Sequence, residues 1–209
     1  MIHLYTWGTP NGRKISIMLE ELGIPYQTHP VDIGHGDQFR PEFLAISPNN
    51  KIPAIVDDEA EGGPLSVFES GAILIYLADK FARFLPPSGR ERYMVIEWLM
   101  WQMGGLGPMT GQLGWFSRSA PEYNPMAIKR YASEVERLFN VLENRLATAS
   151  WAGGKAYSIA DMAIYPWVAQ YRQRIPEHIE PLIQARPFIA GWLETVGGRD
   201  AVQRAMKLP

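Results

Sequence analysis

The 209-residue chain contains no cysteine. Disulfide staples, thiolate metal ligands and a cysteine nucleophile of its own are therefore excluded. Any thiol chemistry must use a thiol that arrives on a small molecule. The four histidines, His3, His29, His35 and His178, are scattered without the spacing of metal ligands, so no metal is expected.

Long apolar runs and a strong excess of one charge are also missing. No stretch reaches the roughly 18 apolar residues that span a bilayer. Residues 1–5 enter a strand-like pattern without the basic and apolar blocks of a signal peptide. The net charge is −2, and no dense Lys/Arg run indicates nucleic-acid binding. We therefore expect a cytoplasmic protein with neither a membrane nor a nucleic acid as partner.

The first part of the chain alternates strand and helix patterns. Residues 2–7 alternate in the manner of a strand, and Ile15, Met18, Leu19 and Leu22 recur with helical spacing. The pattern continues with strands at 26–31, 52–56 and 65–68 and with helices at 41–44 and 70–81. This β-α-β-α-β-β-α order predicts a mixed four-stranded sheet with helices packed on it, and Pro30 indicates an edge strand.

The later part of the chain is predicted to be all helical. Residues 83–90 are interpreted as a linker, so the predicted domains are residues 1–82 and residues 91–209. Helices are expected at 91–103, 158–171, 177–184, 187–196 and 200–206, with another that begins at Asn124-Pro125. Ser158 and Asp161 fit a capping box. The run Gly104–Pro108 is interpreted as a break in a long helix over the substrate site.

Three segments of the first domain are candidates for chemistry. The first is the turn Thr9–Lys14, which opens a helix. Unpaired N–H groups and the helix dipole favour an anion there, and a thiolate at this place would have a depressed pKa. The alternative is that Asn11 only caps the helix.

The other two segments are the entrance to a strand and the start of a helix. Pro53 at a strand entrance indicates an edge or a cis bond, and the backbone of Ile52 is then placed to pair with an extended peptide. Ser70 is predicted to cap the next helix, whose N–H groups would face a carboxylate, while Glu69 is suited to an ammonium group. Together they suit an amino-acid head group; the alternative is an N-cap with an acidic neighbour.

In this order and spacing, the chain resembles the glutathione transferase superfamily from end to end. It looks most like the nu-class, the bacterial YfcG-like disulfide-bond oxidoreductases. The matching phrases are TPNGRKI from Thr9, GDQFRPEFL from Gly36, ISPNNKIPAIVD from Ile46, FESGAIL from Phe68 and WQMGGLGPM from Trp101. The resemblance implies an α/β thioredoxin-like N-terminal domain, an all-α C-terminal domain, a homodimer, and glutathione, reduced or oxidised, as cosubstrate.

The resemblance also implies roles for single residues. Ile52, beside a cis Pro53, would pair its backbone with the cysteinyl part of glutathione, and Glu69 and Ser70 would hold the γ-glutamyl end. The glycine end would contact Gln38 and Lys51. Arg130 matches an arginine that reaches a glutathione carboxylate in the nu-class dimer.

Thr9 and Asn11 would lie beside the sulfur as the catalytic residues. Many family members use a Tyr on the first strand or a Ser or Cys in the turn, but here the strand ends in Trp7. Because Thr and Asn donate hydrogen bonds and are not bases near neutral pH, their expected role is to stabilise a thiolate. Asn11 is expected to contribute more, since its amide is a fixed donor.

The predicted function is glutathione-dependent reduction of small disulfides by two glutathione thiols. One alternative is conjugation of glutathione to hydrophobic electrophiles, for which an aromatic-rich set could line a pocket: Trp7, Trp98, Trp101, Met103, Trp115 and Phe116. A second alternative is a non-catalytic glutathione-binding interaction module.

Overall fold

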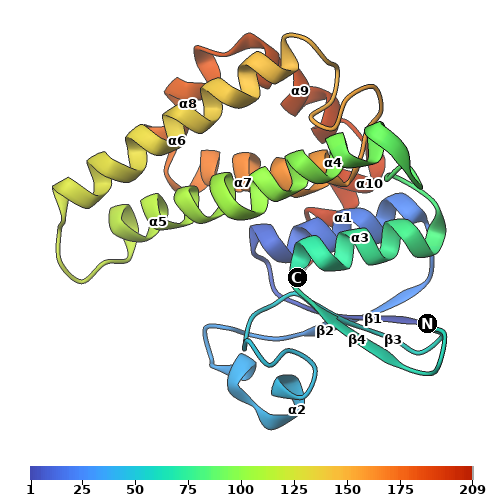
Figure 1. Ribbon diagram of the computed structural model, residues 1–209. Coiled ribbons are helices and arrows are strands. Elements are labelled where there is room, and N and C mark those ends of the chain that lie inside the picture. Colours follow the sequence, from blue (N-terminus) through green and yellow to red (C-terminus); the bar gives the residue numbers. More distant parts are fainter. Residues whose placement is uncertain (209) are drawn as a thin grey trace. The chain divides into compact units, whose positions relative to one another are not determined.

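The computed structural model describes residues 1–208, which form two compact units (Figure 1). The first unit consists of Met1–Arg83 together with residues 200–208, and the second consists of Phe84–Arg199. The sequence places the last helix in the second domain, whereas in the structure α10 (Asp200–Ala205) packs against α1 (Pro10–Leu22) in the first unit. Arg13 of α1 holds this end of the chain, because its guanidinium donates hydrogen bonds to the carbonyls of Ala205, at 2.9 Å, and of Leu208.

The first unit is built on a mixed four-stranded sheet in the order β2-β1-β3-β4, which confirms the predicted fold class. Its strands are β1 (Ile2–Thr6), β2 (Tyr26–Pro30), β3 (Ala54–Asp57) and β4 (Leu65–Phe68). The β1–β2 pair is parallel and the other two pairs are antiparallel. β2 lies at the edge, as the proline that ends it predicts.

Helices cover both faces of this sheet. α1 and α3 (Ser70–Phe81) lie together on one face, and α2 (Pro41–Leu44), which follows the short 3-10 turn η1 (Asp37–Phe39), lies on the other (Figure 1). On the α2 side, Phe43 packs with buried Ala54 of β3. Apolar residues on both faces are therefore buried, as the packing of helices on both faces of a sheet requires.

The strand directions bring the three candidate segments to one edge of the sheet. Tyr5 of β1 is paired with Ala54 of β3, and Ala54 is paired with Phe68 of β4. β1 and β4 run in the same direction and β3 runs against them. The turn after β1, the entrance to β3 and the start of α3 must therefore meet at the same edge.

The second unit contains only helices. They are α4 (Gly89–Trp101), α5 (Gly107–Arg118), α6 (Pro125–Leu146), α7 (Ile159–Arg174), α8 (Pro176–Gln184) and α9 (Pro187–Gly197). α7 is buried along most of its length and contacts α4, α5, α8 and α9, as expected for a helix that is apolar on all sides. The predicted caps are confirmed, because the Asn124 side chain accepts the Ala127 N–H and Ser158 forms a capping box with Asp161.

The prediction that the helix breaks at Gly104–Pro108 is wrong, because the backbone there remains helical. A π-helical turn, η2 (Gln102–Leu106), joins α4 directly to α5, so the backbone stays helical through the glycines. A π turn inserts a residue into a helix without ending it, which the glycine and proline content of the run does not reveal.

Candidate functional site

The turn between β1 and α1 is closed by Thr9. Its backbone is extended (φ −103°, ψ 161°), and its hydroxyl accepts a hydrogen bond from the N–H of Gly12 at 3.2 Å. Pro10 follows as the first helical residue, where its missing N–H removes no helical bond. The alternative that Asn11 is the cap is therefore wrong: Thr9 caps α1, and Asn11 lies inside the first turn, where its side chain lines a pocket.

The entrance to β3 has the geometry that the proline indicated. The Ile52-Pro53 bond is cis. A hydrogen bond holds the segment before this bond, because the Ser47 hydroxyl donates to the carbonyl oxygen of Lys51 at 2.8 Å. Lys51 is exposed, Ile52 is half-buried and Pro53 is buried, so the chain passes from solvent into the sheet at this point.

The start of α3 differs from the sequence prediction by one residue. The capping position is Glu69, which has a left-handed φ of 69° and makes no side-chain capping bond, and Ser70 is the first helical residue. The expectation that Ser70 caps α3 is therefore wrong. Its hydroxyl lies at the beginning of the helix, and the Glu69 carboxylate accepts a hydrogen bond from the side chain of Asn49 at 3.5 Å. The N–H groups of a first helical turn favour an anion at this place.

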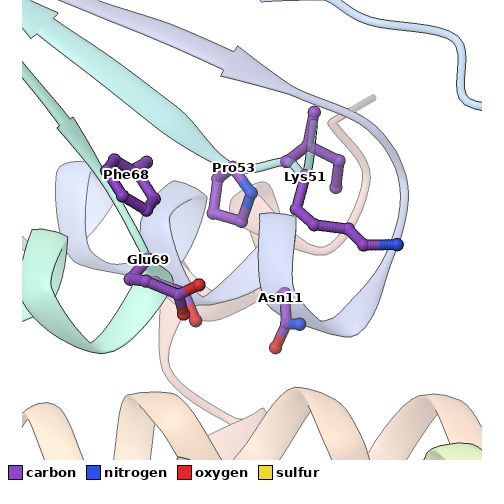
Figure 2. A pocket seen from close by; sticks show the side chains of 7 residues that line it. Asn11, Lys51, Pro53, Phe68 and Glu69 are labelled. Carbon is purple, nitrogen blue, oxygen red and sulfur yellow. The ribbon is translucent and has the colours of Figure 1, made fainter. Parts of the chain in front are cut away.

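These segments line one pocket, whose volume is about 420 Å³ when the solvent-filled space at its opening is included. Its lining consists of Asn11, Lys51, Ile52, Pro53, Phe68, Glu69 and Ser70. Figure 2 shows the side chains of Asn11 and Glu69 reaching into this space from the starts of α1 and α3, while Lys51 extends away from Glu69. Six predicted residues are thus brought together, and Phe68 joins them because β4 ends there.

Three predicted residues do not line this pocket. Thr9 is occupied as the cap of α1. Gln38 lies in η1, where its amide nitrogen donates to the carbonyl of Ile33 at 3.4 Å and its oxygen is buried with no hydrogen-bond partner among the described residues. Arg130 is exposed on α6 of the other unit.

The motifs in the sequence do not single out one further functional candidate, Lys14. Its side chain is fully buried, and its Nζ donates to the Ser70 hydroxyl at 3.3 Å. Burial lowers the pKa of Lys14 to about 7, and the negative charge of Glu69 opposes that shift. A signal exists in the sequence: Lys14 precedes Met18 by four residues and therefore lies on the apolar stripe of α1.

The described residues offer two further observations. Across residues 1–208, no group of three or more His, Asp or Glu side chains is arranged to hold a metal ion. No helix in the same range combines the length and apolar character needed to cross a bilayer.

Comparison with known proteins gives matches over both units. The model described as glutathione S-transferase, N-terminal domain, matches residues 9–80, and the one described as glutathione S-transferase, C-terminal domain, matches residues 125–195. The chain is 52% identical over 209 residues to the disulfide-bond oxidoreductase YfcG of Escherichia coli (strain K12), with 99% of this chain and 94% of the relative covered.

Two solved structures are similar over the whole chain. A glutathione transferase family member from Pseudomonas fluorescens Pf-5, with two glutathione bound, has a TM-score of 0.95 and 46% identity, and the match covers 100% of this chain and 93% of that one. A glutathione transferase from Pseudomonas putida, with one glutathione disulfide bound per subunit, has a TM-score of 0.95 and 43% identity, over 100% of this chain and 91% of that one.

Proposed function

The chain belongs to the glutathione S-transferase family, and we propose that it is a glutathione-dependent disulfide-bond oxidoreductase, which reduces small disulfides with two glutathione thiols. The observation that carries this proposal is the pocket in which Asn11, the Ile52 backbone and Glu69–Ser70 meet, in a chain without cysteine. A site of this kind binds a thiol compound and supplies no thiol of its own.

The pocket suggests how glutathione lies. The γ-glutamyl head group is placed at the start of α3, where Ser70 and the first N–H groups face its carboxylate and Glu69 faces its ammonium group. The backbone of Ile52, beside Pro53, pairs with the cysteinyl part in the manner of an added strand. This orientation directs the sulfur to the start of α1.

The remaining predicted contacts follow from that orientation. Asn11 donates a hydrogen bond to the thiolate, and Thr9 supports it by holding the turn. Lys51 and Gln38 are assigned to the glycine end. We assign Arg130 to a glutathione carboxylate in a homodimer, and we place this protein in the cytoplasm. We also keep the division into a glutathione-binding domain at 1–82, a linker at 83–90 and a helical domain from 91 onward, with residues 200–208 attached to the first.

The reaction conserves sulfur and electrons without a metal or an enzyme thiol. A bound glutathione thiolate attacks one sulfur of the substrate disulfide, forms a mixed disulfide and expels the other substrate sulfur as a thiolate, which takes up a proton. A second glutathione thiolate attacks the glutathione sulfur of that mixed disulfide. The products are oxidised glutathione and two substrate thiols, so two glutathione molecules are oxidised and one disulfide is reduced.

Stabilisation of the thiolate is the step for which the start of α1 is suited. A free thiol has a pKa near 8.5, so only a few per cent is ionised at pH 7. Each hydrogen bond to the anion, at roughly 1.5–3 kcal/mol, lowers that pKa by about one to two units and raises the reactive fraction correspondingly.

The test is a pair of steady-state assays on one preparation. The first measures reduction of a small hydroxyalkyl disulfide by glutathione, and the second measures conjugation of glutathione to a halonitrobenzene. We expect the disulfide rate to be well above the conjugation rate. The opposite ratio would assign the chain to the conjugating transferases, and two silent assays with measurable glutathione binding would indicate a non-catalytic binding module.

A further inference from the structure

Lys14 lies directly behind the proposed head-group site. It follows Asn11 by three residues on α1, so the two residues share one side of the helix. Lys14 is among the largest side chains of the protein with no exposed surface, and its Nζ is 3.3 Å from the hydroxyl oxygen of Ser70. A buried ammonium group is thus in contact with the residue that opens α3.

Burial of a charged lysine costs free energy, because the ammonium group loses its hydration, and this cost favours the neutral form of Lys14. Removal from water lowers its pKa from 10.5 to about 7, and the charge of Glu69 acts in the opposite direction. Both protonation states of Lys14 are therefore accessible near neutral pH.

The charges on the elements packed against α1 do not replace Glu69 in this role. They are Asp79 and Lys80 on α3, Asp200 and Arg204 on α10, and Arg13, Glu20 and Glu21 on α1 itself. Lys80 is paired with Asp57, and Arg204 is paired with Glu20. Within residues 1–208, the charge of Glu69 raises the pKa of Lys14, and Glu69 lies at the head-group site.

We infer that Lys14 is a positioning residue for the γ-glutamyl end of glutathione, which acts through Ser70 and takes up a proton when the ligand carboxylate binds at the start of α3. The inference rests on the proposed function, because it assumes that this end of glutathione occupies the pocket.

The chemistry of the two side chains gives the mechanism. A protonated lysine can only donate, so it donates to the Ser70 oxygen and does not compete for the Ser70 O–H, which can then donate to the ligand carboxylate. A neutral lysine can accept from Ser70 and turn that O–H away from the pocket. The incoming carboxylate also favours the charged form of Lys14 directly, and by linkage protonation favours binding to the same extent.

Calorimetry of S-methylglutathione binding, in buffers with different ionisation enthalpies, tests this inference. The blocked sulfur removes thiol ionisation from the proton count. At pH 8, where Lys14 is mostly neutral in the free protein, we expect the unmodified protein to take up a large fraction of one proton more than Lys14→Met does. At pH 6 the two proteins should show little difference. Between pH 7 and 9 the affinity of the unmodified protein should fall by up to about tenfold per pH unit.

Three variants separate positioning from a structural role. Lys14→Met should bind weakly at every pH and should raise KM more than it lowers kcat. Lys14→Arg, which stays charged, should keep the affinity and lose the pH dependence. Lys155→Met removes a lysine whose side chain is 92% exposed, and it should leave the proton count unchanged.

The outcomes also separate this inference from the proposed function. Binding by the unmodified protein without proton uptake at pH 8 would sink the inference alone, whether or not the variants fold. A Lys14→Met variant with unchanged proton uptake would do the same. If S-methylglutathione and oxidised glutathione both fail to bind the unmodified protein, the proposed function falls and this inference falls with it.

Discussion

Asn11→Ala should strongly lower disulfide reductase activity and leave the fold nearly unchanged. Asn11 lines the pocket at the start of α1, whereas the capping bond of that helix is made by Thr9. The amide side chain therefore lines the space assigned to the sulfur and does not make the capping bond. Its loss takes away a donor to the thiolate and takes no cap away from the helix.

The expected size of the effect follows from the strength of one hydrogen bond to a charged group. At roughly 1.5–3 kcal/mol, its loss lowers kcat/KM by about 10- to 100-fold. The same energy raises the pKa of the bound thiol, so the alkaline rise of the rate should move upward by about one to two pH units.

Thr9→Ala should lower the stability of the fold more than Asn11→Ala does, and it should lower the activity less. Removing a threonine cap lowers the free energy of unfolding by about 0.5–2 kcal/mol, and Thr9→Ser, which keeps the hydroxyl, should restore most of it. Its kcat/KM should fall less than that of Asn11→Ala. Asn11→Asp is the matched control in the pocket, because it keeps the shape but puts a carboxylate beside the thiolate; its rate should fall at least as far.

Two measurements decide between these expectations. Reduction of a hydroxyalkyl disulfide, followed from pH 6 to 9, gives the rate and its apparent pKa. Urea unfolding gives the stability from the midpoint at constant slope. Equal rate losses in the two alanine variants, or a larger loss in Thr9→Ala, would refute the assignment of Asn11 as the main thiolate donor.

Three further predictions concern the scaffold of the site. Arg13→Met should lower the free energy of unfolding by about 3 kcal/mol, since two carbonyls lose a charged donor, and hydrogen exchange should be faster in α10 than in α3. Gly12→Ala should lower Tm strongly, because the added Cβ would lie 2.3 Å from the carbonyl oxygen of Trp7. Gly191→Ala on α9 is the control and should leave Tm nearly unchanged, because an added Cβ there would have no atom within 4 Å. Equal losses of Tm in the two variants would contradict the close approach at Gly12. Lys14→Met should raise the free energy of unfolding most below pH 7, by on the order of 4 kcal/mol, and this gain should vanish as the pH rises from 7 to 10.5. The reason is that the lowered pKa of Lys14 destabilises the folded protein only at pH values where the lysine is protonated in the unfolded chain. A gain in urea unfolding that does not depend on pH would overturn this prediction.

Local patterns in the sequence were sufficient for most elements and their order, although they did not predict α5. The periodicity of apolar residues predicts the four strands and places α2, β4 and α3 at the residues where the structure has them. Turn residues predict the edge position of β2 and the start of α6. These features depend on neighbours within a few residues, so the sequence contains all the information that they need.

The sequence did not identify either helix cap at the site: Ser70 was predicted as the cap of α3, and Asn11 was offered as an alternative cap of α1. Each helix start offers adjacent polar side chains, and the pattern does not say which has the extended or left-handed backbone of a cap. The structure gives that position to Thr9 before α1 and to Glu69 before α3. The difference matters for function, because Asn11 and Ser70, which are not the capping residues, both line the pocket.

The sequence by itself determined the α/β order of the first unit, the helical second unit, the absence of an enzyme thiol and six of the residues that line the pocket. Only the tertiary structure decided that α10 joins the first unit through Arg13, and that Lys14 is buried behind Ser70. Both are contacts between residues more than 50 positions apart. Periodicity and capping rules describe interactions within one turn or strand, whereas the burial of a charge depends on which distant element covers it.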